Sequence, residues 1–174
     1  QRQMCIRDRG MFVYYFGFKE EYMKVLFQKI YEDYLFKLQD YPEKDAKAAV
    51  QLQQIFYRMT KYFVENFNTA NFLNEALYHS KAASYFTNYR VQHFIFIRTL
   101  IEQAQREGDI CSDMNSYEIY TTLQSILVQP IIIKNSILEQ HKNEPLMEKL
   151  KLIDVDSESS LQKRLRVAFK GLRP

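Results

Sequence analysis

Residues 10–21 read Gly-Met-Phe-Val-Tyr-Tyr-Phe-Gly-Phe-Lys-Glu-Glu. Aromatic residues fill the first half, Gly17 interrupts them, and a long amphipathic pattern begins at Lys19. Glycine readily takes the backbone angles that end a helix, so the stretch predicts a short helix, a tight turn and a new helix. Glu20 and Glu21 favour that new helix, because they fall at the positive end of its dipole.

Downstream of this stretch, apolar residues recur at helical spacing along the whole chain. With only four Gly and four Pro, the chain has too little turn material for many short strands. The fold class is therefore expected to be all-α, with about six helices of unequal length. The expected helices span residues 19–38, 43–66, 70–79, 81–106, 116–140 and 157–170, with a short one near 146–152.

Local signals predict where several of these helices begin, end or bend. Pro42 is expected near the first turn of the second helix, where a missing N–H costs nothing. Gly108 is expected to stop the long helix before it, and Asn115 to cap the next one together with Glu118. Pro130 lies inside that next helix and should kink or break it, since proline removes a backbone donor.

Length and charge limit the class of protein. A chain of 174 residues fits one domain that can bury a core without disulfides or metals. Its net charge is +3, but residues 1–9 resemble a translated sequencing adapter and are expected to be non-native. Without their three Arg and one Asp, 21 basic residues face 20 acidic ones. Net charge therefore gives no support for nucleic-acid binding by the remainder.

Cysteine usage and hydropathy predict the compartment. Cys5 falls within residues 1–9, so Cys111 is left without a partner for a disulfide, which suits a reducing cytoplasm. No apolar run approaches the roughly 20 residues that span a bilayer. We expect a soluble, cytoplasmic chain with no membrane partner.

Residues 10–21 resemble the join between the DNA-recognition helix and the first core helix of TetR-type (TetR/AcrR-like) bacterial transcriptional regulators. In that family the pattern reads roughly Gly-x-Leu-Tyr-Tyr-His-Phe-x-Ser-Lys-Glu-Glu-Leu. The positions that match in register are Gly10, Tyr14, Phe16, Lys19, Glu20 and Glu21, whereas Val13, Tyr15, Phe18 and Tyr22 depart. The order and lengths of the expected helices are similar to the family's regulatory core.

The resemblance implies a division of the chain. Residues 10–18 would be the remnant of a helix-turn-helix head, and residues 19–174 a ligand-binding and dimerisation domain. The head would need two further helices before Gly10 to hold the recognition helix in the major groove. The chain as given is therefore expected not to bind an operator by itself.

The resemblance also implies DNA contacts and a subunit interface. Tyr and Lys side chains at a helix start can donate to phosphate oxygens. The DNA-facing candidates are Met11, Tyr14, Tyr15 and Lys19. A small local core is the alternative for this stretch. For a homodimer interface formed by the last two long helices, the candidates are Leu123, Leu127, Leu161, Leu165 and Ala168. Leu161, Leu165 and Ala168 are expected to be exposed on one subunit. The alternative is ordinary packing inside a single chain.

An aromatic stripe with a few polar tips predicts a pocket for a flat or aromatic small molecule. The candidate lining is Phe56, Tyr57, Thr60, Phe63, Tyr85, Phe86, Tyr89, His93 and Gln124. Tyr89 and His93 are the most specific pair, because they lie four residues apart and buried polar tips require partners. The alternative is that the stripe is ordinary core.

Metal and enzyme chemistry are not expected. Glu75 and His79 lie one helical turn apart, but the paired Glu-x-x-His motifs of di-iron bundles are absent from the sequence. Cys111 has no activating base beside it in sequence. There is no phosphate-binding glycine loop and no Gly-x-Ser-x-Gly motif.

The leading interpretation is a ligand-responsive, DNA-binding transcriptional repressor that uses no cofactor. The chain would represent its effector-binding and dimerisation domain. Its partners would be a second copy, a small hydrophobic or aromatic effector and, in the full-length protein only, operator DNA. The effector would shift the helix over residues 19–38 like a lever, with Pro130 absorbing part of the change. The alternatives are a stand-alone helical carrier or sensor of hydrophobic ligands and a helical-bundle enzyme.

Overall fold

A computed structural model describes residues 19–39, 42–43, 45–69, 72–73, 80–140 and 146–174. These residues form an all-α fold. Its described elements are α2 (Lys19–Gln39), α3 (Ala48–Glu65), α5 (Ser80–Arg106), α6 (Ser116–Leu127), α7 (Gln129–Gln140), α8 (Leu146–Lys151) and α9 (Glu158–Gly171). The expected helices over residues 19–38, 81–106 and 157–170 are confirmed to within a residue or two. The expected helix over residues 70–79 lies mostly outside the described residues.

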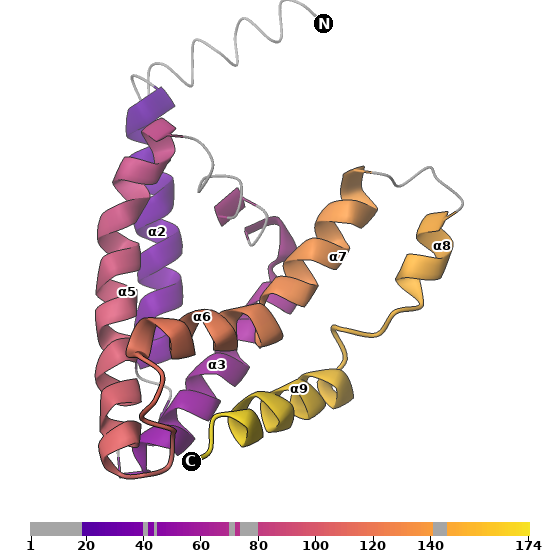
Figure 1. The fold of residues 1–174 in the computed structure, drawn as a ribbon. Coiled ribbons are helices and arrows are strands. Elements are labelled where there is room, and N and C mark those ends of the chain that lie inside the picture. Colours follow the sequence, from indigo (N-terminus) through magenta and orange to yellow (C-terminus); the bar gives the residue numbers. More distant parts are fainter. Residues whose placement is uncertain (1–18, 40–41, 44, 70–71, 74–79, 141–145) are drawn as a thin grey trace, which may run out of the picture.

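The helices are arranged around α3 and α6 (Figure 1). α2 and α5 lie side by side as a long pair, and α3 contacts both of them. α6 crosses from α5 to α9, while α7 continues from α6 and leads to α8. Among the described helices, none combines the length and apolarity that crossing a membrane requires.

One continuous core joins these helices. Its largest fully buried side chains are Phe27, Phe56, Leu38, Leu52, Ile55, Met59, Ile97, Ile101, Ile110, Ile119, Leu123 and Leu127. They come from α2, α3, α5, α6 and the turn after α5. On each of these helices the buried residues recur at the spacing of one helical face, which is why the apolar pattern predicted the helices. The core therefore forms where these faces meet around α3 and α6.

Sequence signals place the junction between α5 and α6 as expected. Gly108 has φ +74°, a left-handed angle that glycine tolerates and other residues avoid, and it lies two residues after the end of α5. Asn115 caps α6: its side chain accepts from the N–H groups of Tyr117 and Glu118. Glu118 in turn accepts from the N–H of Asn115 at 2.8 Å, completing a capping box.

The predicted effect of Pro130 is confirmed as a break. α6 ends at Leu127 and α7 begins at Gln129. Pro130 has no N–H for the carbonyl of Ile126, and the N–H of Ile131 bonds to Val128 instead of reaching back to Leu127. Two carbonyls are thereby released from the helical ladder.

Arg164 of α9 occupies this break. Its Nη1 donates to the carbonyl of Leu127 at 2.8 Å and of Ile126 at 3.4 Å, and its Nη2 donates to Val155. Partial burial lowers the pKa of the guanidinium, and nearby Asp156 and Asp154 oppose that shift. One cation therefore satisfies the carbonyls released by Pro130 and ties α9 to the α6–α7 junction.

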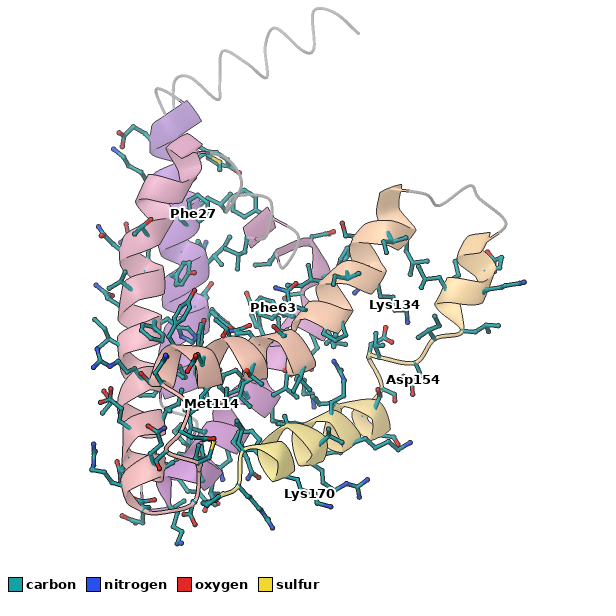
Figure 2. The ribbon with its side chains drawn as sticks, in the orientation of Figure 1. Phe27, Phe63, Met114, Lys134, Asp154 and Lys170 are labelled. Atoms are coloured by element: carbon teal, nitrogen blue, oxygen red, sulfur yellow. The ribbon has the colours of Figure 1, made fainter. Side chains whose placement is uncertain are left out.

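A partly buried ion pair holds α7 to the segment before α9. Lys134 is only 9% exposed and its Nζ lies 2.9 Å from Asp156 Oδ1. Figure 2 shows Lys134 on α7 and Asp154 in the connection from α8 to α9 on facing sides of the same gap. Asp154 accepts from the N–H of Ser157 at 3.0 Å, and Ser157 caps α9. The connection is thus fixed by polar contacts at the start of α9.

The expected start of α3 at residue 43 is wrong. α3 begins at Ala48, and Lys47 precedes it without a side-chain cap. The N–H of Glu43 donates to the side chain of Gln54, and the N–H of Ala46 bonds to the carbonyl of Glu43 in a turn. These bonds satisfy the backbone after Pro42 without a helix.

The expected exposure of the α9 interface residues on one subunit is also wrong. Within one chain, α9 packs against α6. The five interface candidates are buried there: Leu123, Leu127, Leu161, Leu165 and Ala168. Their apolar faces cover each other, which is the alternative of ordinary packing inside a single chain.

Candidate ligand-binding site

Aromatic side chains from four helices meet in the interior next to α6. We call them the aromatic cluster, and its central members are Tyr34, Tyr62, Phe63, His93 and Tyr120. Tyr34 of α2 lies at its centre, with ring centroids 4.7 Å from Tyr62 and 5.5 Å from Phe63 of α3. The ring of His93 on α5 lies 6.2 Å from Tyr34 and 6.3 Å from Tyr120 of α6. Such separations are typical of favourable aromatic pairs.

Further rings extend the cluster along α5. Tyr31 of α2 stacks on Tyr89 with centroids 4.9 Å apart. Phe94 meets Tyr120 edge-on at 5.4 Å. Aromatic contacts of α5 with α2 and α6 therefore extend over about one and a half helical turns.

Two buried polar atoms of the cluster have no hydrogen-bond partner among the described residues: Tyr34 Oη and His93 Nδ1. Their side chains are only 5% and 6% exposed. An unsatisfied buried polar atom costs on the order of 1–3 kcal/mol, so each such atom in a folded protein requires an explanation.

Burial also sets the ionisation of these two groups. It raises the pKa of Tyr34 well above its ordinary value, with Tyr120, Tyr31 and Tyr62 adding to the shift. It lowers the pKa of His93 to about 4, because the charged imidazolium would lose its hydration. Near neutral pH the site therefore presents a phenol and a neutral imidazole.

Other polar groups of the site are already bonded. Thr60 Oγ1 donates to the carbonyl of Phe56 at 2.7 Å, one turn back on α3. Gln124 Nε2 donates to Tyr120 Oη at 3.1 Å and lies 3.6 Å from Met59 Sδ. The unmet hydrogen-bonding capacity is thus concentrated at Tyr34 and His93.

Most predicted lining residues with described side chains meet in this region. Phe56, Thr60, Phe63 and His93 are buried in one core, and Tyr89 and Gln124 are half-buried at its edge. Tyr85 and Phe86 lie on α5, but their side chains fall outside the described residues.

The prediction that Tyr57 lines the same pocket as the other candidates is wrong. Its hydroxyl donates to Glu158 Oε2 of α9 at 3.0 Å, and Lys61 Nζ lies 5.9 Å from its ring centroid. One residue along α3 turns a side chain by about 100°, so Tyr57 faces α9 while its neighbour Phe56 faces the core. Tyr57 also lines a cavity of about 530 Å³ between α3 and α9, on a different side of α3 from the aromatic cluster.

Three central residues of the cluster were not predicted as site residues: Tyr34, Tyr62 and Tyr120. Tyr34 lies on the apolar stripe of α2, which indicated core but not an unmet hydroxyl. Tyr120 and Gln124 lie four residues apart on α6, a spacing that places them on one face. Because Gln124 was a predicted lining residue, this spacing could have indicated Tyr120 as well. No comparable spacing in the sequence indicated Tyr62.

The DNA-facing candidates are not tested. Met11, Tyr14 and Tyr15 lie outside the described residues, and so does the side chain of Lys19. The prediction of DNA contacts therefore stays a prediction.

The candidates for metal or nucleophile chemistry add no site. Glu75 and His79 lie outside the described residues. Within the described ranges, no three His, Cys, Asp or Glu side chains gather closely enough to hold a metal ion. Partial burial raises the pKa of Cys111, with Asp113 adding to the shift, so the thiol is not activated.

No protein-family model matches the chain, and no curated protein is significantly similar to it.

Proposed function

We propose that this chain is the effector-sensing part of a ligand-responsive, DNA-binding transcriptional repressor of the TetR type. The observation that carries the proposal is a pair of buried atoms, Tyr34 Oη and His93 Nδ1, that have no hydrogen-bond partner in the described part of the chain. They come from two helices that lie side by side, and Tyr34 lies on the helix that would connect the core to a DNA-binding head. The resemblance of residues 10–21 to the family's head–core join supports the same assignment.

The effector that fits this site is a small hydrophobic or aromatic molecule with a polar group. Aromatic rings from α2, α3, α5 and α6, tilted against one another, supply apolar surroundings for such a molecule. The Tyr34 hydroxyl would donate to an acceptor on the effector, and the neutral His93 ring would complete its polar contacts. A molecule that satisfies both groups would remove two desolvation penalties at once.

The switch would act through α2. An effector that hydrogen-bonds Tyr34 and His93 stabilises one position of α2 against α5, and only such differential affinity can shift a two-state equilibrium. The break at Val128 between α6 and α7 supplies a point where packing beside the site can adjust. Movement of α2 would then change the spacing of two DNA-binding heads in a homodimer and release the operator.

The homodimer remains part of the proposal, with different contact residues. Because α6 and α9 cover each other, a second copy would pack on apolar side chains that stay exposed. Toward the C-terminal half these include Ile133 and Ile137 on α7, Leu152 and Ile153 after α8, and Val167 on α9. Light scattering at micromolar concentration should show a dimer, and Ile133→Glu with Ile137→Glu should convert it to a monomer that stays folded. A monomeric parent chain would contradict this part.

The effector site is tested by matched tyrosine variants. A thermal-shift screen with small aromatic molecules would identify a ligand, and its affinity would be measured by calorimetry. Tyr34→Phe removes only the hydroxyl and should weaken binding about three- to tenfold, as expected for one neutral hydrogen bond. Tyr57→Phe removes a hydroxyl on a different side of α3 and should leave affinity unchanged. Equal effects of the two variants would remove the basis for this site.

The regulator and the stand-alone carrier differ in what precedes residue 10 in the gene. Two in-frame helices of a DNA-binding head would support the regulator, and operator binding by that longer product should be lost on adding the effector. A native start codon near Met11 would instead support a carrier of hydrophobic ligands, which would use the same interior site without DNA.

A further inference from the structure

The cavity of about 530 Å³ between α3 and α9 is a second site with a different chemistry from the aromatic cluster. Its volume falls within the range of small-molecule pockets. We call it the α3–α9 groove. Its apolar floor is made by Tyr57 of α3 and by Leu165 and Phe169 of α9. Leu165 and Phe169 are buried in the chain, so the floor is fixed by the core beneath it.

Three cations line the same groove: Arg166, Lys170 and Arg173. All three are exposed, and none has a side-chain hydrogen bond or ion pair with any described residue. They follow one another at spacings of four and three residues, so α9 and its end present them on one face. The groove therefore joins an apolar floor to an unneutralised positive rim.

The arrangement has a cost within α9. Like charges four residues apart destabilise a helix by a few tenths of a kcal/mol. The negative end of the helix dipole offsets this for Lys170 in the last turn, but its effect does not extend back to Arg166. Helix stability alone thus does not account for Arg166.

No acidic side chain in the part of the chain that the structure describes forms an ion pair with the rim. The carboxylate bonded across the groove is Glu158, at the opposite end of α9 from Arg173. It accepts from Tyr57 Oη at 3.0 Å and from Gln162 Nε2 at 2.8 Å, and these bonds lower its pKa. Lys61 also faces Glu158 and compensates its charge. The positive end of the groove remains available.

From these features we infer that the α3–α9 groove binds a small organic anion. An apolar or aromatic body would lie on Phe169 and Leu165, and a carboxylate or phosphate head would be held by Arg166, Lys170 and Arg173. Guanidinium groups suit both heads, because their paired N–H donors match two oxygens. A nucleic-acid backbone is disfavoured, because the three cations gather at one groove and the chain carries little net charge. The inference is independent of the proposed regulatory function.

Four probes separate the parts of the inference. Phenyl phosphate and benzoate carry an apolar ring with the two alternative heads, benzyl alcohol lacks the charge, and inorganic phosphate lacks the ring. Titration of the full chain would be followed by the NMR signals of the Phe169 and Tyr57 rings. We expect one of the two aromatic anions to bind at least about tenfold more tightly than benzyl alcohol and inorganic phosphate. The preferred anion identifies the head group. Its affinity should fall as salt is added, because exposed charges are screened.

Charge-neutralising variants on α9 test the location. Arg166→Gln and Lys170→Gln should each weaken binding about two- to fivefold, the range for exposed ion pairs, and the double variant about tenfold. Lys163→Gln removes an exposed cation of the same helix that does not line the groove, and it should leave affinity unchanged. Circular dichroism should show all four variants folded.

Several results would overturn the inference. Binding of benzyl alcohol as tight as that of both anions would remove the role of the cations. An equal loss in Lys163→Gln and Lys170→Gln would indicate general attraction to a basic helix. A change of self-association in Arg166→Gln, without any anion binding by the parent chain, would make the groove a contact between subunits instead.

Discussion

Acidification should destabilise this fold through one buried histidine. The folded chain holds the pKa of His93 at about 4, against an ordinary value of 6.5. Between these values the unfolded chain binds a proton that the folded chain does not, so the free energy of unfolding falls as the pH drops. The full difference between the two pKa values corresponds to about 3 kcal/mol in the free energy of unfolding. About 2 kcal/mol of it should be lost between about pH 7 and pH 5.

The variant His93→Phe isolates this contribution. It keeps a ring of similar shape, removes the titration and removes the unpartnered Nδ1. Urea unfolding of both proteins across this pH range should show a stability difference that grows in favour of the variant as pH falls. Near neutral pH the variant should already be more stable by about 1 kcal/mol, because an unsatisfied buried atom is gone.

Tyr34→Phe is the matched control. It removes the other unpartnered polar atom of the cluster but no group that titrates in this range. It should therefore keep the parental pH dependence. A pH-independent difference between His93→Phe and the parent chain would refute the linkage. A loss of more than about 1 kcal/mol at neutral pH would show that Nδ1 makes a stabilising hydrogen bond in solution.

Three further predictions concern the joints of the fold, each measured by urea unfolding. Arg164→Met should cost about 1.5–3 kcal/mol, because it leaves the carbonyls at the proline break unsatisfied, whereas Lys163→Met on the same helix should change stability by less than about 0.5 kcal/mol. An equal effect of the two would contradict this role of the arginine. Gly108→Ala should cost about 1 kcal/mol through its left-handed backbone, while Gly171→Ala, whose φ is not positive, should be neutral or slightly stabilising. The glycine argument fails if both are tolerated. Asn115→Ala should cost about 1 kcal/mol by removing the cap of α6, and an unchanged midpoint would show that the capping box is dispensable.

Local chemistry in the sequence predicted much of the backbone. The stop at Gly108, the cap at Asn115 and the break at Pro130 depend on single residues and their immediate neighbours. Such signals do not depend on tertiary packing, because they act through backbone angles, caps and missing donors. The start of α3 was predicted wrongly because it depends on a more distant residue. The N–H of Glu43 donates to the side chain of Gln54 on α3, so the backbone after Pro42 needs no helix there.

The sequence by itself determined which residues share a face of each helix, because the period of 3.6 residues is a property of one helix. Only the tertiary structure decided what covers each face. Phe56 and Tyr57 are neighbours in sequence, yet one enters the core and the other faces α9. The stripe of Leu161 and Leu165 was predicted to face a second copy, yet it is buried within one chain, where α9 packs against α6. Tyr34 and His93 come together because α2 packs along α5, and within the described ranges Tyr34 Oη and His93 Nδ1 find no hydrogen-bond partner. Contacts between distant segments depend on how whole helices dock, and no local spacing encodes that.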